Sequence, residues 1–115
     1  MSAITSHVLD TSRGLPAEGV PVRLERAAAS GDGWEPVGRG STDADGRVRE
    51  LAPAGAPLAA GRYRLTFGTG PYFEASGQYA FYPEISVVFT VDDGAGHYHV
   101  PLLLNPFGYS TYRGS

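Results

Sequence analysis

The sequence predicts an all-β fold in which two antiparallel sheets pack face to face. Three observations favour this fold class. Glycine (16) and proline (9) are spread along the 115 residues and separate short apolar runs, as turns separate strands. Several runs alternate apolar and polar side chains with the period of a half-buried strand. No segment carries the long helical period needed to cover a parallel sheet, so a two-sheet sandwich is the simplest solution.

The first half of the chain is expected to contain four strands. In the second of them, Val20, Val22 and Leu24 alternate with polar neighbours, which indicates one buried face. A turn is expected at 42–46, because its aspartates can accept backbone hydrogen bonds and Gly46 can take a positive φ. The strands are expected at residues 4–10, 20–25, 34–40 and 47–51, with a turn at 15–19 and a loop at 27–33.

The second half is expected to contain four more strands and one short helix. Tyr63, Leu65 and Phe67 alternate with polar residues, as in a strand with one buried face. Residues 72–80 have no period of two, so one or two helical turns are expected there. The strands are expected at residues 61–68, 85–91, 98–104 and 109–113, after a proline- and alanine-rich loop at 52–60.

Composition excludes several classes of function. A length of 115 residues fits one domain, 1–115. The net charge of -3 gives no indication of a nucleic-acid or membrane partner. There is no lysine for a Schiff base and no cysteine for thiolate catalysis or disulfides. No signal peptide or membrane-spanning run is visible, so a cytoplasmic location is expected.

The three histidines are the first candidates for chemistry. His97 and His99 are two residues apart on a strand and share one face, whereas Tyr98 and Val100 take the opposite, apolar face. If Val8 is in the core, His7 also points outward. Arg47 follows the turn at 42–46 and is expected to place a cation nearby.

Other interpretations remain open on residue types alone. The histidines can be ordinary surface residues, and Arg47 can be a solvated side chain after a turn. Three histidines also suit a catalytic zinc ion with an open fourth position. A Ser6–His7–Asp10 triad is disfavoured, because Ser6 and His7 point to opposite faces of a strand.

Five segments together resemble one family, the 5-hydroxyisourate hydrolases. The resemblance covers nearly the whole chain, and its closing segments are the most specific. Asn105 departs from the expected serine, but it lies in a turn. The segments are residues 7–11, 42–47, 81–84, 97–104 and 109–115.

The resemblance implies a transthyretin-like antiparallel β-sandwich of two four-stranded sheets with one short helix. It also implies hydrolytic ring opening of 5-hydroxyisourate to 2-oxo-4-hydroxy-4-carboxy-5-ureidoimidazoline in urate catabolism, without metal or cofactor. His7, Arg47, His99 and Ser115 are the implied catalytic residues, and His7, Arg47 and Tyr112 the implied substrate-binding residues. His97 matches the motif but is not expected to be catalytic. The family forms a homotetramer with its sites between subunits.

Two non-enzymatic alternatives accompany this expectation. A transthyretin-like binding module would carry a small molecule without needing the two histidines and the arginine. A structural sandwich domain cut from a longer protein would need no site at all. Loss of activity on replacing His7 or His99 separates the enzyme from the binding module, and the complete closing signature argues against the structural domain.

Overall fold

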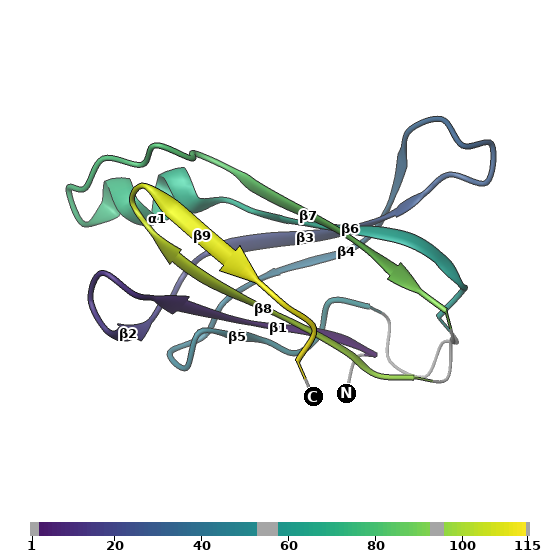
Figure 1. The fold of residues 1–115 in the computed structure, drawn as a ribbon, viewed down its shortest axis with the longest axis horizontal. Coiled ribbons are helices and arrows are strands. Elements are labelled where there is room, and N and C mark those ends of the chain that lie inside the picture. Colours follow the sequence, from purple (N-terminus) through teal and green to yellow (C-terminus); the bar gives the residue numbers. More distant parts are fainter. Residues whose placement is uncertain (1–2, 53–57, 93–95, 115) are drawn as a thin grey trace.

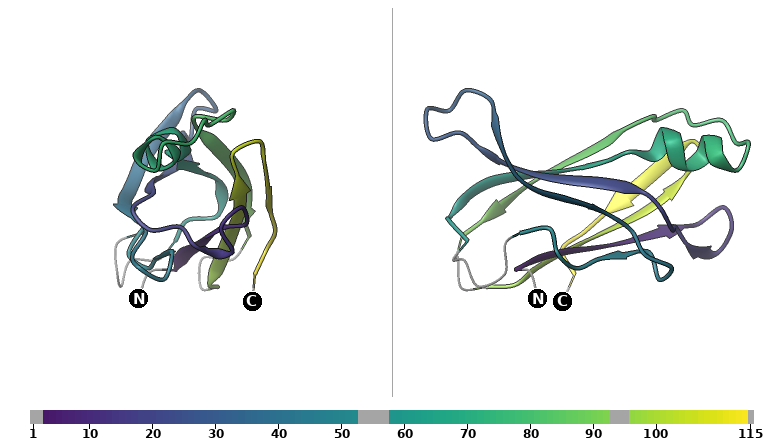
Figure 2. Two further views of the ribbon diagram at one scale, coloured as in Figure 1. Left: turned by 90° about the vertical axis from the view of Figure 1, so that its left-hand side faces the viewer. Right: turned by 180° about the vertical axis from the view of Figure 1, so that it is seen from behind.

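Two β-sheets face each other and enclose the core of the protein, with one short helix at an end of the sandwich (Figures 1 and 2). The computed structural model describes residues 3–52, 58–92 and 96–114. In these residues the elements are β1 (Ile4–Asp10), β2 (Leu15–Pro16), β3 (Pro21–Ala27), β4 (Trp34–Ser41), β5 (Arg47–Val48), β6 (Gly61–Phe67), α1 (Thr69–Ala75), β7 (Ile85–Val91), β8 (Tyr98–Asn105) and β9 (Gly108–Thr111).

One sheet has five strands where four were expected. Its order is β2-β1-β8-β9, and the short β5 also pairs with β1. β2 and β5 follow each other along the same strand, because Leu9 and Asp10 pair with β2 whereas Ser6 and His7 pair with β5. β5 ends at Val48, earlier than the predicted residue 51.

The same sheet contains one parallel pair in an otherwise antiparallel arrangement. β1 runs parallel to β8 from Ile4↔Tyr98 to Asp10↔Leu104. A parallel pair requires a long crossover, and the chain between β1 and β8 supplies it. Periodicity identifies a strand and its buried face but not its direction, so the expectation of antiparallel pairing was wrong for this one pair.

The second sheet has four strands in the order β4-β3-β6-β7, all antiparallel. The predicted alternation is confirmed here, because Val22 and Leu24 on β3 and Tyr63, Leu65 and Phe67 on β6 are all buried. On the facing sheet Val8, Val100 and Leu102 are buried as well. The inward faces of the two sheets therefore form the core.

The helix lies three residues earlier than its predicted start at residue 72. Within the helix, the side chain of Phe73 is buried, and the amide of Gly70 donates to the carbonyl of Pro83 at 2.8 Å. The helix ends early because Gly77 has φ 72° and donates to Glu74, while Gln78 donates to Phe73. This pair of hydrogen bonds is the Schellman arrangement that closes helices before a left-handed glycine.

A buried aspartate ties this helix to the first strand. Asp10 is fully buried, and its carboxylate accepts the Tyr72 hydroxyl at 2.7 Å, the Ser12 amide at 3.0 Å and the Ser12 hydroxyl at 2.6 Å. Burial, and then the bond to Asp10, raises the pKa of Tyr72. Within the described residues, no helix is long and apolar enough to cross a membrane.

Candidate functional site

Three neighbouring strands bring His7, Arg47 and His99 to the outer face of the five-stranded sheet. His7 on β1 pairs with Arg47 on β5, and Thr5 on β1 pairs with His99 on β8. Their inward neighbours Ser6, Val8 and Val100 are buried, whereas all three candidate side chains are half-buried. The predicted outward direction of the histidines is therefore confirmed, and strand register explains how residues distant in sequence meet.

The turn before β5 is organised by the carboxylate of Asp43. Its Oδ1 accepts the amides of Asp45 at 2.9 Å and Arg47 at 3.0 Å, and its Oδ2 pairs with Arg49 at 3.2 Å. The bond from the Arg47 amide, followed by that from Asp45 and the charges of Arg49 and Arg47, holds the pKa of Asp43 below its ordinary value against a smaller opposing effect of burial. A charged Asp43 therefore fixes the start of the segment that carries Arg47.

The same turn determines the proton position on His7. Nε2 of His7 lies 2.8 Å from the carbonyl oxygen of Asp45. Because a carbonyl only accepts hydrogen bonds, Nε2 carries a proton and donates it. Nδ1 is then the nitrogen of His7 that remains for other chemistry.

His99 is held from two sides. Its Nδ1 lies 2.8 Å from the hydroxyl of Thr5, and its carbonyl accepts the amide of Gly114 at 2.8 Å. Burial lowers the pKa of His99 below the ordinary 6.5, the charges of Arg47, His7 and His97 lower it further, and a bond to the Thr5 main chain partly opposes them. His99 is therefore a neutral imidazole at neutral pH.

Arg47 brings an unpaired positive charge to this group. Within residues 3–52, 58–92 and 96–114, its guanidinium forms no ion pair or hydrogen bond. It lines an open pocket of about 170 Å³ together with Thr5, Ser6, Val48, Arg49, His97 and His99. An arginine fork next to a neutral imidazole suits a substrate with carbonyl oxygens or developing negative charge.

Two described site residues, His7 and Tyr112, are not among those that line this pocket, although His7 pairs with Arg47 on the neighbouring strand. Tyr112 is largely exposed and lines an apolar pocket of about 300 Å³ between β7 and the end of the chain, with Phe89, Val100 and Arg113 among its neighbours. Ser115 lies outside the described residues. The roles proposed for Tyr112 and Ser115 stay predictions.

Sequence reasoning missed Thr5 as a member of the site. Its hydroxyl contacts both His99 and, at 3.2 Å, Nε2 of His97. The available signal was its outward position two residues before His7. That signal becomes useful only when the parallel register of β1 and β8 is known.

The alternative catalytic arrangements gain no support from this geometry. The hydroxyl of Ser6 is buried and donates to the carbonyl of Val100 at 2.7 Å, and Asp10 is buried on the same inward side. Neither can join His7 on the outer face. Among the described residues, no three His, Cys, Asp or Glu side chains are grouped to hold a metal ion.

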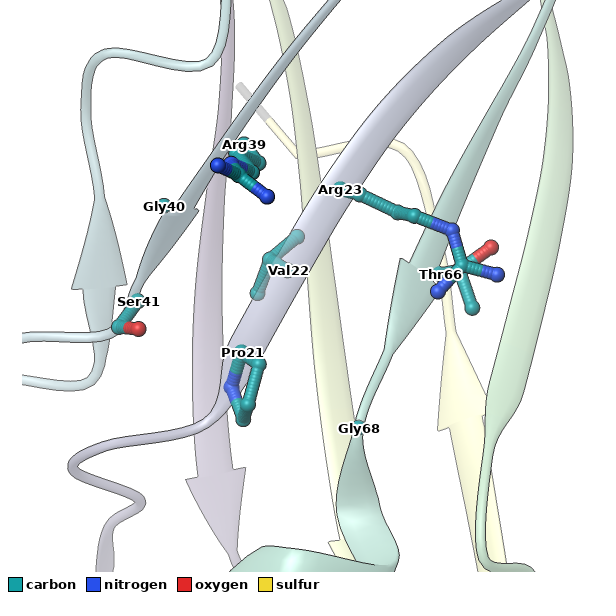
Figure 3. Close-up of a pocket in the computed structure, with 8 residues that line it drawn as sticks. All are labelled: Pro21, Val22, Arg23, Arg39, Gly40, Ser41, Thr66 and Gly68. Atoms are coloured by element: carbon teal, nitrogen blue, oxygen red, sulfur yellow. The ribbon is translucent and has the colours of Figure 1, made fainter. Parts of the chain in front are cut away.

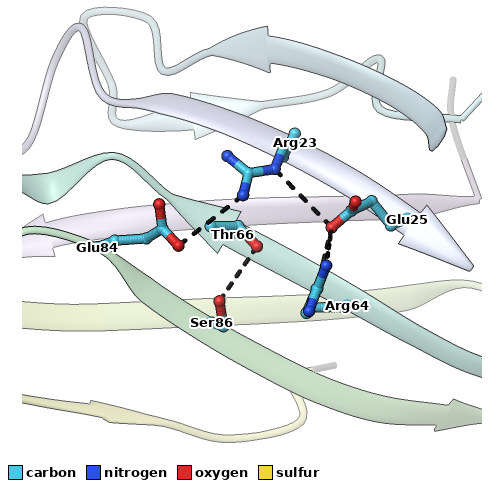
Figure 4. Close-up of polar contacts among 6 residues, drawn as sticks. All are labelled: Arg23, Glu25, Arg64, Thr66, Glu84 and Ser86. Carbon is cyan, nitrogen blue, oxygen red and sulfur yellow. Dashed lines mark hydrogen bonds and ion pairs between the residues drawn. The ribbon is translucent and has the colours of Figure 1, made fainter. Parts of the chain in front are cut away.

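Larger concave regions lie away from these residues. One of about 520 Å³ on the four-stranded sheet contains Arg23 and Arg39 (Figure 3). Arg23 there lies 3.8 Å from both Glu25 and Glu84, and Arg64 contacts Glu25 at 2.7 Å (Figure 4). Carboxylates thus pair with Arg23 in this region, whereas neither Arg39 nor Arg47 forms an ion pair within the described residues. We place the site at the smaller pocket because it brings Arg47 and His99 together.

Fold and site together define a small β-sandwich protein with a His–Arg–His cluster on the outer face of one sheet. A family model described as the HIUase/Transthyretin family matches residues 4–114. The chain belongs to this family, as the five sequence segments had indicated.

Individual relatives agree with this assignment. The 5-hydroxyisourate hydrolase of Salmonella typhimurium is 48% identical over 112 residues, which cover 97% of this chain and 80% of that protein. The mouse (Mus musculus) 5-hydroxyisourate hydrolase is 44% identical over 114 residues, covering 99% and 96% of the two chains.

Solved structures confirm the transthyretin-like fold. The 5-hydroxyisourate hydrolase of Klebsiella pneumoniae matches with a TM-score of 0.83 and 41% identity, covering 97% of this chain and 98% of that one. Sea bream transthyretin in complex with thyroxine matches with a TM-score of 0.89 and 33% identity, covering 98% and 95%. Since the thyroxine-bound transthyretin superposes at least as well as the hydrolase, the fold alone does not decide the function.

Proposed function

We propose that this chain hydrolyses 5-hydroxyisourate to 2-oxo-4-hydroxy-4-carboxy-5-ureidoimidazoline in urate catabolism. The observation that carries the proposal is that His99, whose pKa is lowered, shares one pocket with Arg47, which has no ion-pair partner among the described residues. A base and a fixed cation are the two groups that attack of water on a cyclic amide requires. A carrier of the same fold would need neither.

His99 acts as the general base in this mechanism. Its depressed pKa leaves it neutral at neutral pH, so it can take a proton from a bound water as the water oxygen bonds to the ring carbonyl carbon. The carbonyl oxygen gains negative charge in that step. The guanidinium of Arg47 donates hydrogen bonds to this oxygen, and removing such a donor typically costs about a hundredfold or more in rate.

The ring opens when the bond between this carbon and the ring nitrogen breaks. The nitrogen must then receive a proton. His7 already donates from Nε2 to the Asp45 carbonyl, so it can deliver a proton only from Nδ1, and only in its doubly protonated form. We assign this acid role to His7, with the two histidines forming one coupled proton-handling pair.

We further propose that the working form is a homotetramer with each site between subunits. The pocket of about 170 Å³ is smaller than the roughly 300 Å³ at which ligand pockets usually begin. A two-fold-related copy facing the outer surface of the sheet would supply the missing walls. Tyr112 would then close the pocket against the substrate ring.

Ser115 is proposed to complete the site, on the strength of the family resemblance. The amide of its neighbour Gly114 donates a hydrogen bond to the carbonyl of His99, so the last described residue lies next to the proposed general base. Deleting Ser115, or adding a C-terminal tag, is expected to reduce kcat with little change in Tm. Full activity of a tagged protein would remove Ser115 from the mechanism and leave the roles of His7, Arg47 and His99 intact.

The direct test follows the absorbance decay of freshly generated 5-hydroxyisourate with and without the protein. Acceleration at micromolar protein is expected, and the His7→Ala and His99→Ala variants should lose most of it. Decay at the spontaneous rate with folded wild-type protein would refute the proposed function. If the variants keep the wild-type rate, the catalytic roles of these histidines are wrong.

Metal independence is tested separately. We propose that no metal takes part, so dialysis against a chelator should leave kcat unchanged. Loss of activity that zinc restores would instead make the histidine cluster a metal site. We also propose a single domain over 1–115, supported by the hydrophobic cluster that the described strands share, and a cytoplasmic location.

A further inference from the structure

We propose that Thr5 and His97 are positioning residues that hold His99 in the one tautomer able to act as a base. This inference rests on the role of His99 under the proposed function. It gives a purpose to the second histidine of the closing motif, which the family resemblance left without one.

The three side chains form a chain of hydrogen bonds across β1 and β8. The hydroxyl oxygen of Thr5 lies 2.8 Å from Nδ1 of His99 and 3.2 Å from Nε2 of His97. Thr5 is only 6% exposed, although its strand position points outward. Within the described residues, the two imidazoles are the hydrogen-bond partners of this hydroxyl.

If the Thr5 hydroxyl donates to one imidazole and accepts from the other, the chain of hydrogen bonds can run in two directions. A hydroxyl donates one hydrogen and accepts others, and a neutral imidazole carries its hydrogen on one of two nitrogens. In the first direction, Nδ1–H of His99 donates to Thr5, and the Thr5 hydroxyl donates to Nε2 of His97. In the second, both donations are reversed, and Nε2 of His99 carries the hydrogen.

Only the first direction leaves His99 competent as a base. With its hydrogen on Nδ1, Nε2 keeps a free lone pair that can receive a proton from water. The base role proposed for His99 therefore requires this direction, in which Nδ1–H donates to the Thr5 hydroxyl oxygen 2.8 Å away. His97 stabilises the same direction as the acceptor of the Thr5 hydroxyl.

The charged groups around His99 do not select its tautomer in place of Thr5. Arg47 and His7 face His99 from β5 and β1, Arg49 lines the same pocket, and Arg113 lies 4.6 Å from the ring of Tyr98. Of these groups, Arg47 and His7 lower the pKa of His99 and so affect whether it is charged. Among the described residues, only Thr5 is recorded at the Nδ1 atom, so it determines which nitrogen carries the hydrogen.

The test compares Thr5→Val, Thr5→Ser and His97→Ala with the wild type. Valine matches threonine in shape and strand preference but has no hydroxyl, whereas serine keeps it. Thr66→Val is the matched control, because Thr66 is also buried and its hydroxyl contacts Ser86 at 3.2 Å on the other sheet.

The first readout is the ¹⁵N NMR spectrum of the imidazoles, which reports the tautomer directly and does not require activity. With three histidines in the chain, loss of one signal in His99→Ala assigns the residue. We expect His99 in the Nδ1–H form in the wild type, Thr5→Ser and Thr66→Val. In Thr5→Val we expect a mixture of tautomers, and in His97→Ala a smaller shift in the same direction.

The second readout is steady-state kinetics. Thr5→Val should lower kcat by about tenfold, a part of the roughly hundredfold that a well-placed base contributes, with KM within about twofold. Thr5→Ser should recover most of this loss. An Nε2–H form in the wild type, or an unchanged tautomer or kcat in Thr5→Val, would overturn the inference. A wild type without activity refutes the proposed function instead, and the NMR result still decides the tautomer.

Discussion

At the residue scale, the environment of His99 separates this site from a group of ordinary surface histidines. The residue is half-buried, and it faces a guanidinium without a partner among the described residues. Both conditions disfavour the imidazolium form. The consequence is an imidazole that stays neutral at neutral pH, as the proposed base role of His99 requires.

The pH dependence of activity follows from this environment. The pKa of His99 is lowered from 6.5, mainly by burial and then by Arg47, so its neutral form persists below that pH. The acid limb of kcat/KM is therefore expected to have its midpoint below pH 6.5. Unfolded His99 binds a proton at higher pH than folded His99, so its contribution to stability is complete above 6.5 and decreases as pH falls through the lower folded value. A pH–rate profile checks the first statement, and unfolding at several pH values checks the second.

Arg47→Gln should have two separable effects. Loss of the charge next to the developing oxyanion is expected to lower kcat by about a hundredfold. Loss of its repulsion should also raise the pKa of His99, though burial keeps it below 6.5. NMR titration and kinetics measure the two effects. Arg39→Gln, on the other sheet, is the matched control, and equal losses in both variants would contradict a specific role for Arg47.

Strand periodicity was enough to predict the outward position of His7 and His99. It could not identify Thr5, because the Thr5–His99 contact depends on which strands are neighbours. It also could not reveal the lowered pKa of His99, since burial is a property of the assembled sheet. The link from the Asp45 carbonyl to His7 depends on turn geometry that residue types indicate only in outline.

At the element scale, the turn between β4 and β5 connects stability with the site. Gly46 has φ 76°, and a Cβ placed there would lie 2.3 Å from the carbonyl oxygen of Val8. The same turn supplies the amide of Arg47 and the carbonyl that orients His7. A tight turn against β1 is thus what fixes two of the three site residues.

Gly46→Ala should therefore lower the free energy of unfolding by more than the cost of placing alanine at a positive φ. Gly31 has φ 84° but open space around it, so Gly31→Ala measures the backbone cost by itself, which is about 1 kcal/mol. Gly46→Ala adds a clash with backbone and should exceed that value clearly. Urea unfolding gives both free energies, and equal values would show that the close approach to Val8 is unimportant.

The segment after β9 is expected to affect activity more than stability. A Cβ at Gly114 would lie 2.7 Å from Cδ2 of the His99 ring. Gly114→Ala should displace that ring and lower kcat by about tenfold, a part of what a positioned base contributes. Gly108→Ala is the control, since its nearest neighbour would be 3.8 Å away. A fully active Gly114→Ala protein would show that the ring tolerates displacement.

Most elements could be predicted from the sequence, but their pairing could not. The strand 85–91 has the predicted bounds, and β1 matches as well. The bounds of the helix differ from the predicted ones. Tertiary contacts of Phe73 and Gly70 fix its position, and local propensity does not indicate such contacts. The parallel pairing of β8 with β1 also depends on contacts between residues distant in sequence. The same is true of the pairing of β1 with both β2 and β5.

At the scale of the whole molecule, one side of the sandwich is open to another chain. Within the described residues, β7 pairs only with β6, and β9 pairs only with β8. Between them lies the apolar pocket that includes Val87, Phe89 and Tyr112. Exposed strand edges of this kind readily pair with another chain. A symmetric partner therefore suits this side and the proposed tetramer.

Val88→Lys tests this arrangement. Val88 is 52% exposed on β7, and a charge there should oppose burial against a second copy. Light scattering should give four times the 12.1 kDa of one chain for the wild type and a smaller species for the variant, with lower activity. Ala29→Lys, in the exposed loop between β3 and β4, should remain tetrameric. A monomeric, fully active wild type would refute the assembly.

The parallel pairing of β1 with β8 has a consequence for how the protein reaches its active form. The contact between Thr5 and His99 joins residues 94 positions apart, and such distant pairings slow folding because the chain must close a long loop first. During synthesis, the pocket cannot form until the last strands have left the ribosome. In refolding, hairpins such as β3–β4 should appear earlier than catalytic activity, which would arise only as the two ends of the chain come together.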